Sequence, residues 1–292
     1  MPPSDSRLII VAGPTAVGKT GYAVELAHAL GTDIVSCDSR QFYREMNIGV
    51  ARPSSAELAS VRHHFVACRS VAEPYNIYDY HRDATAVVQR LLDTRGVAVA
   101  VGGSGLYIEA LCNGVSFLPD PSPALRDELQ RMPIDEKRRR LQQLDPVYYG
   151  RVDRDNPVRL QRALEVCLTA GRPYSDLLAE QQPVPPPFRC ETHILQLPPD
   201  LLRRRIDGRV DRMMADGLLD EVRSLLPFRH LNTLRTVGYT ELFAHLDGTV
   251  ALDEAVAQIK LNTWHYARKQ LTWLRREQHK NPSTKVINIP TQ

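Results

Sequence analysis

The sequence lacks any apolar run long enough to cross a membrane, so we expect no membrane-spanning helix. Its N-terminal stretch, MPPSDSRLIIVAG, has no basic region and no small-residue cleavage site, and it therefore predicts a first strand rather than a signal peptide. The five cysteines form no CxxC pair, which favours free thiols over disulfides or a zinc site. These absences together predict a cytoplasmic protein without a membrane partner.

The sequence also lacks a strong excess of charge of either sign. Its 37 basic and 34 acidic residues leave a net charge of +3, which favours a polyanionic partner only weakly. Hydrophobic residues make up 43%, as in ordinary globular enzymes. A length of 292 residues suits one large domain, or a core domain with a smaller insert.

Strand and helix patterns alternate in the first third of the chain. Residues 7–13, 33–37 and 97–103 are short apolar runs typical of buried parallel strands. Residues 20–30 and 85–96 have apolar side chains at helical spacing, and each run stops at a glycine. This alternation predicts an α/β fold with a parallel sheet flanked by helices.

The pattern changes in the middle of the chain. Residues 119–188 contain no strand signal, and the proline-rich stretches LPDPSPA and QQPVPPPF border charged helical segments. We therefore expect a helical insertion domain over 119–188 and an α/β core made of 1–118 and 189–292. A long helix at about 252–276 and a last strand at 285–289 are predicted for the core.

The stretch GPTAVGKT fits the pattern of a phosphate-binding loop, G-x-x-x-x-G-K-[ST], between a predicted strand and a predicted helix. In such loops the backbone N–H groups cradle phosphate oxygens, Lys19 adds a positive charge, and the Thr20 hydroxyl ligates Mg²⁺. The following helix directs its N-terminal dipole at the anion. A kinase, an NTPase and a transferase that expels diphosphate all remain compatible with this motif. The predicted phosphate-binding residues are Gly13, Pro14, Thr15, Ala16, Val17, Gly18, Lys19 and Thr20.

The stretch DSRQFY follows the second predicted strand, where ligands bind in open parallel sheets. Asp38 is a candidate general base, an outer partner of Mg²⁺, or a helix N-cap. Ser39 and Gln41 are candidates for reading a purine edge, while Phe42 and Tyr43 either stack on a base or belong to the core. The glycines of GGSGLY would permit close approach of a ligand. The N/T-K-x-D motif of nucleotide-switch GTPases is absent.

Seven stretches in register resemble one family. From the first strand to about residue 276, the chain is similar to the tRNA dimethylallyltransferases, chiefly the bacterial ones, which are also called isopentenyl-diphosphate:tRNA transferases. The stretches that carry this resemblance are GPTAVGKT, DSRQFY, HHF, GGSGLY, NPVRLQRALEV, TVGYTEL and YARKQLTW. Small departures, such as Val17 in the loop and YARKQ for YAKRQ, preserve the loop glycines and the charge.

The resemblance implies a P-loop NTPase-like core and a reaction. A dimethylallyl group passes from dimethylallyl diphosphate to the exocyclic amine of the adenosine on the 3′ side of the anticodon in a tRNA, and diphosphate leaves. Asp38 matches the family's base, Arg235 matches an arginine that contacts the diphosphate, and Lys19 and Thr20 with Mg²⁺ stabilise the leaving group. We expect this enzyme to be a monomer.

The resemblance also implies the contacts with tRNA. They lie around Asp38, in a helix of the insertion domain, and in the basic helix near the C-terminus, where Tyr266 and Gln270 also match family positions. Ser104 replaces the family's usual threonine but keeps its hydroxyl. The predicted tRNA-binding residues are Asp38, Ser39, Arg40, Gln41, Ser104, Arg126, Val158, Arg159, Leu160, Gln161, Arg162, Arg268 and Lys269.

Three other functions are compatible with part of this pattern. A small-molecule kinase would use the same loop and core, with the insert acting as a lid. A related transferase would prenylate free adenine nucleotides, although the arginines of the insert argue against it. A non-catalytic RNA-binding module would not need Lys19, Thr20 and Asp38.

Overall fold

The computed structural model describes residues 6–181, 183–280 and 283–290, and the chain divides into two compact units. The core unit consists of Met1–Cys112 and Pro186–Gln292, and the inserted unit is Asn113–Pro185. These boundaries lie three to six residues before the expected ones. None of the described helices is both long and apolar enough to span a membrane.

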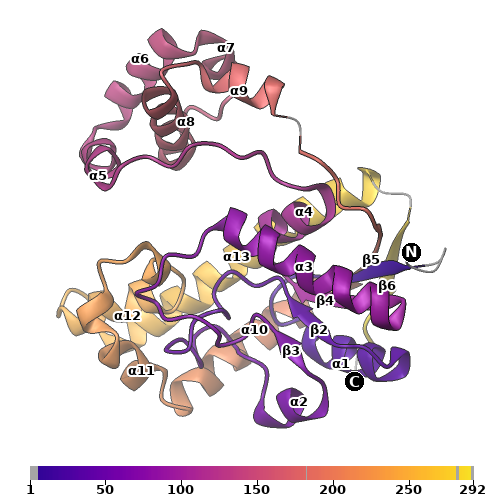
Figure 1. Cartoon of the computed structure of the whole chain (residues 1–292). Helices are drawn as coiled ribbons and strands as arrows, with labels where there is room; N and C mark the ends of the chain where they lie inside the picture. The colour runs from indigo at the N-terminus through magenta and orange to yellow at the C-terminus, as the bar shows by residue number, and fades with distance from the viewer. Residues whose placement is uncertain (1–5, 182, 281–282, 291–292) are drawn as a thin grey trace. The chain divides into compact units, whose positions relative to one another are not determined.

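The core unit is built on a parallel sheet. Within the described residues this sheet has six strands in the order β3-β2-β4-β1-β5-β6, so β1 lies between β4 and β5 (Figure 1). The predicted parallel α/β fold is confirmed. β3 was not expected, because two residues are too few to give a strand pattern. The strands are β1 (Arg7–Ala12), β2 (Ile34–Ser36), β3 (His63–His64), β4 (Val97–Gly102), β5 (Arg189–Gln196) and β6 (Thr284–Asn288).

Helices cover both faces of this sheet. Side chains alternate along each strand, so the apolar strands present apolar side chains to both faces, and both must be covered. On β1, Leu8 and Ile10 pack with α3, whereas Val11 packs with α1 on the opposite face. The helices of the core unit are α1 (Lys19–Leu30), α2 (Ser55–Ser60), α3 (Ile77–Arg95), α4 (Gly105–Asn113), α10 (Pro199–Ala215), α11 (Leu218–Ser224), α12 (Tyr239–Leu246) and α13 (Leu252–Lys280).

The long helical run after β5 is two helices rather than one. α10 ends at Ala215, and α11 begins after Gly217, whose φ of 98° is strained for residues other than glycine. Two short 3₁₀ turns, Leu226–Phe228 and Asn232–Leu234, then lead to α12.

The inserted unit is helical and has its own small core. Leu129, Leu141, Leu160 and Leu164 are fully buried there. Tyr148 and Tyr174 pack edge to face at 4.6 Å between ring centroids. Its helices are α5 (Pro123–Arg131), α6 (Ile134–Leu144), α7 (Pro146–Tyr149), α8 (Pro157–Ala170) and α9 (Tyr174–Glu180).

A buried carboxylate ties two of these helices together. Asp145 has no exposed surface, and it accepts hydrogen bonds from the backbone N–H of Tyr148 at 2.8 Å and of Ser175 at 2.6 Å. The Ser175 hydroxyl donates a third bond to it at 2.8 Å. Asp145 therefore caps α7 and anchors the start of α9.

Replacement of Asp145 by alanine should destabilise the inserted unit. It leaves three buried donors without their acceptor, which should cost about 3 kcal/mol in the free energy of unfolding. Urea denaturation measures this loss, with Asp127→Ala on exposed surface of α5 as the control. Equal unfolding midpoints for the two variants would contradict the anchoring role.

Candidate active site

The predicted phosphate loop lies between the end of β1 at Ala12 and the start of α1 at Lys19. Gly18 has φ 103° and Ala16 has φ 65°, so the chain turns sharply through left-handed conformations before the helix. The first N–H groups of α1 have no acceptors within the helix and, together with the helix dipole, favour an anion.

Lys19 is held at the loop in a partly buried position. Its Nζ donates to the carbonyl oxygen of Pro14 at 2.8 Å. Burial, and next the positive charge of Arg209, lower the pKa of Lys19 to about 8, while the negative charge of Asp38 opposes the shift. The ammonium group is therefore poised to gain a bound anion as a partner.

A stripe of arginines on α10 faces the same loop. Arg209 donates to the Thr15 hydroxyl at 3.2 Å, and Arg205 lies 3.5 Å from the carbonyl oxygen of Val17. With Arg212 they follow the i, i+4, i+7 spacing of one helix face. Burial and the charge of Arg212 lower the pKa of Arg209. This stripe was not predicted, although its spacing is visible in the sequence RRRIDGRVDR.

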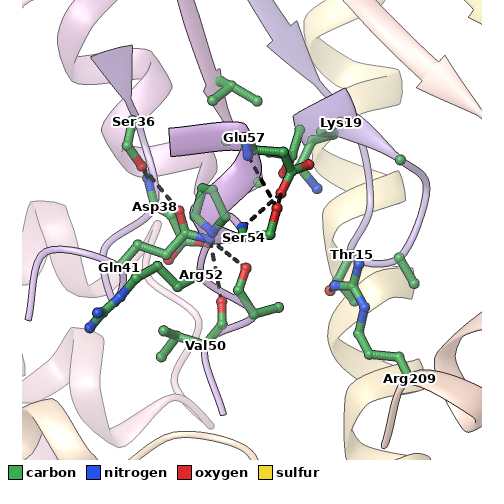
Figure 2. A pocket seen from close by; sticks show the side chains of 18 of the residues that line it. Thr15, Lys19, Ser36, Asp38, Gln41, Val50, Arg52, Ser54, Glu57 and Arg209 are labelled. Carbon is green, nitrogen blue, oxygen red and sulfur yellow. Dashed lines mark hydrogen bonds between the residues drawn. The ribbon is translucent and has the colours of Figure 1, made fainter. Parts of the chain in front are cut away.

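Two cavities meet beside the loop. The first, about 590 Å³, is lined by Lys19, Thr20 and Arg212, and the second, about 560 Å³, by apolar side chains such as Ile259 and Val237. In Figure 2, Thr15 and Arg209 lie on one side of the first cavity and Asp38 on the other. The residues common to both cavities are Thr15, Asp38, Val50, Ala51, Arg209, Met213 and Tyr266.

Asp38 follows the carboxyl end of β2, as predicted, and lines both cavities. Its Oδ1 accepts from the N–H of Arg40 at 2.9 Å, which is a turn within the loop rather than a helix N-cap. Tyr266 is 44% exposed on the cavity wall, and desolvation there, followed by the charge of Asp38, raises its pKa to about 12. The carboxylate is therefore placed where molecules in the two cavities would meet.

The segment 47–52 forms a wall of both cavities. Glu221 of α11 accepts from the N–H groups of residues 47–49 at 3.0, 2.7 and 3.0 Å, and the Tyr239 hydroxyl donates to it at 2.7 Å. A Cβ on Gly49 would lie 2.6 Å from the Tyr239 ring, so only glycine fits there. Glu221 was not singled out from the sequence, because the backbone N–H groups from which it accepts lie more than 170 residues away.

The side chain of Gln41 also stabilises the segment 47–52. Its Nε2 donates to the carbonyl oxygens of Val50 at 3.3 Å and Ala51 at 3.1 Å. Gln41 would therefore have to break these two hydrogen bonds in order to make its predicted contact with a purine. Phe42 and Tyr43 are buried at 0% and 5% exposure, which places both in the core.

The glycines of the turn after β4 lie against side chains of α13. A Cβ on Gly103 would lie 2.2 Å from Gln270 Nε2, and one on Gly105 would lie 2.6 Å from the Trp273 ring. The glycines therefore make room for side chains of α13; Gly102 and Gly103 also line the first cavity, so the expected approach of a ligand stays a prediction. Gln270 is only 7% exposed but lines the first cavity, so its predicted RNA contact stays a prediction; Arg268 and Lys269 on the same helix are exposed.

Arg235 lines the second cavity and is not among the residues that line the first. Its predicted contact with diphosphate therefore stays a prediction, whereas Arg209 and Arg212 already surround the loop. Ser39 and Arg40 line the second cavity, and Ser104 follows Gly103 at the start of α4.

In the inserted unit, the predicted tRNA contacts divide between surface and core. Val158 and Arg159 are exposed on α8, and Arg126 is exposed on α5. Gln161 and Arg162 are half-buried and pair with neighbours such as Glu165. Leu160 has no exposed surface, so its side-chain contact with tRNA is wrong. It belongs to the apolar face of α8 with Ala163, Leu164 and Cys167.

The chemistry of the first cavity fits a magnesium ion held mainly by substrate oxygens. Mg²⁺ in phosphate sites commonly takes one or two protein oxygens, and Thr20 and Asp38 both line this cavity. Among the described residues no group of three or more His, Cys, Asp or Glu side chains forms a dedicated metal site.

Comparison with known proteins finds one family. The model of the family "IPP transferase" matches residues 41–277. The tRNA dimethylallyltransferase of Christiangramia forsetii is 42% identical over 92% of this chain and 90% of its own, and that of Flavobacterium johnsoniae is 39% identical over 97% and 94%. The solved tRNA isopentenylpyrophosphate transferase of Bacillus halodurans superposes with a TM-score of 0.69, at 30% identity over 97% of this chain and 90% of its own.

Binding of inorganic diphosphate should weaken as pH rises through about 8. Lys19 is charged below its lowered pKa of about 8 and neutral above it, so the free protein loses this charge within that range. Above pH 8 the affinity should fall by up to about tenfold per pH unit, as linkage to one proton requires. Isothermal titration calorimetry between pH 7 and 9.5 measures this change in affinity.

Two lysine variants test the origin of this pH dependence. Lys19→Met should bind diphosphate weakly with little change across this range, whereas Lys260→Met, on the surface beside Asp211, should behave as the parent protein. A parent affinity that stays constant up to pH 9.5 would contradict the role of Lys19.

Proposed function

The chain belongs to the IPP transferase family, and from this we propose that it transfers a dimethylallyl group from dimethylallyl diphosphate to a tRNA. The acceptor is the exocyclic N6 amine of the adenosine on the 3′ side of the anticodon. The observation that carries the proposal is the position of Asp38 where a cationic cavity meets a more apolar one.

The donor occupies the first cavity with its diphosphate against the phosphate loop. Lys19 and the α10 arginines concentrate positive charge there, where negative charge accumulates on the leaving oxygen as the C–O bond breaks. The dimethylallyl group then extends toward Met213 and Val50, which are shared with the second cavity.

Magnesium is part of this proposal. The Thr20 hydroxyl and the diphosphate oxygens would hold it, with Asp38 nearby as an outer partner. When bound, the ion neutralises charge on the leaving diphosphate.

The acceptor adenine enters the second cavity, unstacked from its loop as enzymes that modify bases require. Its amine is a poor nucleophile because the lone pair is delocalised into the ring. Asp38 takes the N6 proton as the new N–C bond forms and the C–O bond breaks, so the products are prenylated adenosine, diphosphate and a proton on the carboxylate. The flanking Tyr266, whose pKa is about 12, stays neutral throughout.

The remaining tRNA contacts are proposed for exposed cations. Arg126 and Arg159 of the inserted unit, and Arg268 and Lys269 of α13, offer charge for phosphate groups of the RNA. We further propose that the enzyme acts as a monomer in the cytoplasm.

Replacement of Asp38 by asparagine should reduce transfer by about 10²–10⁴-fold, because the general base is lost while the shape is kept. The assay mixes enzyme, Mg²⁺, radiolabelled dimethylallyl diphosphate and an unmodified anticodon stem-loop, and counts label in the RNA. Affinity for inorganic diphosphate should change little in this variant. Asp93→Asn, on the exposed side of α3, is the matched control.

The same assay separates the proposed function from its rivals. Label should disappear when the acceptor adenosine becomes guanosine. An active Asp38→Asn enzyme would remove Asp38 from the mechanism. Transfer only to free AMP, or phosphoryl transfer from ATP without prenylation, would overturn the proposed function itself.

A further inference from the structure

The side chain of Gln270 joins the phosphate loop to the turn after β4. Its Oε1 accepts from the backbone N–H of Thr15 at 2.9 Å, and its Nε2 donates to the carbonyl oxygen of Gly103 at 2.8 Å. The partners lie 255 and 167 residues away in the chain. One amide therefore fixes the separation of two segments that local structure leaves independent.

The amide has one usable orientation. A flipped amide would set its NH₂ against the Thr15 N–H and its oxygen against the Gly103 carbonyl, so both bonds would be lost. The space is also closed, because a Cβ on Gly103 would lie 2.2 Å from Nε2. The 7% exposure of Gln270 keeps water from replacing the two bonds.

Both ends of this bridge border the first cavity, and one of them also borders the second. Thr15 lines both cavities, and its hydroxyl accepts from Arg209. Gly103 lines the first cavity and is followed by Ser104, a predicted contact of the acceptor RNA. The bridge therefore joins two walls of the proposed donor cavity, and its Thr15 end also borders the proposed acceptor cavity.

We propose that Gln270 is a positioning residue for the transfer reaction, which fixes the phosphate loop and the β4–α4 turn relative to each other. This inference rests on the proposed function. The amide itself forms no bond to either substrate; it acts through Thr15 and Gly103. Its loss should misplace the donor carbon relative to the acceptor amine, and small misplacements in such geometry cost large factors in rate.

The variants Gln270→Met and Gln270→Glu separate bridging from packing. Methionine has a similar length but forms neither bond, so kcat should fall by about 10–100-fold. Gln278→Met, an exposed position on the same helix, is the matched control and should retain the parent kcat. Thermal unfolding shows which variants remain folded.

The pH dependence of Gln270→Glu tests the two hydrogen bonds, because a change in packing alone would not depend on pH. A protonated carboxyl reproduces the amide, since one oxygen accepts from Thr15 and the O–H donates to Gly103. An ionised carboxylate instead repels the Gly103 oxygen and places negative charge beside the diphosphate. The ratio of variant to parent kcat should therefore rise by about tenfold as pH falls from 8 to 6.

Inorganic diphosphate binding is measured alongside, because it does not depend on prenyl transfer. Both variants should bind diphosphate about tenfold more weakly than the parent at pH 8. A parent protein that binds diphosphate but prenylates no RNA would refute the proposed function while leaving the bridge in place. The positioning role is overturned if folded Gln270→Met keeps the parent kcat and diphosphate affinity, or if the Gln270→Glu ratio does not change with pH.

Discussion

The site depends on the register of three neighbouring parallel strands. β1 pairs with β4 so that Ala12 lies opposite Gly102, and β4 pairs with β2 so that Ser36 lies opposite Val101. The three strands therefore end at one edge of the sheet. The phosphate loop, Asp38 and the glycine-rich turn leave from that edge and meet there, although they are distant in sequence.

A second constraint is the accumulation of positive charge in a partly buried site. Lys19 and Arg209 share one cavity; burial and the charge of Arg209 lower the pKa of Lys19, while burial and the charge of Arg212 lower that of Arg209. Part of the free-energy cost of gathering these charges is offset by hydrogen bonds. The Pro14 carbonyl oxygen accepts one from Lys19, and the Thr15 hydroxyl accepts one from Arg209. A bound diphosphate would relieve the repulsion, so the same cluster serves both affinity and stabilisation of the leaving group.

Sequence reasoning succeeded where a feature is local. The phosphate loop, the strands beside it and Asp38 follow from patterns a few residues long. It failed where tertiary contacts decide: the inward face of α10 with Arg209, and Gln270, whose partners lie far away in the chain. The predicted contact of Leu160 with tRNA was wrong for another reason. The residues of a family motif were carried over as a whole, although helical spacing already placed the Leu160 side chain on the inward face.

In the proposed mechanism, donor and acceptor approach Asp38 from opposite cavities. A crystal structure with a non-transferable thio analogue of dimethylallyl diphosphate and an anticodon stem-loop tests it most directly. We predict that the diphosphate lies against Lys19 and Arg209, with the unstacked adenine in the second cavity and its N6 within hydrogen-bond distance of Asp38. Diphosphate bound beside Arg235 instead, or an adenine amine remote from Asp38, would contradict it.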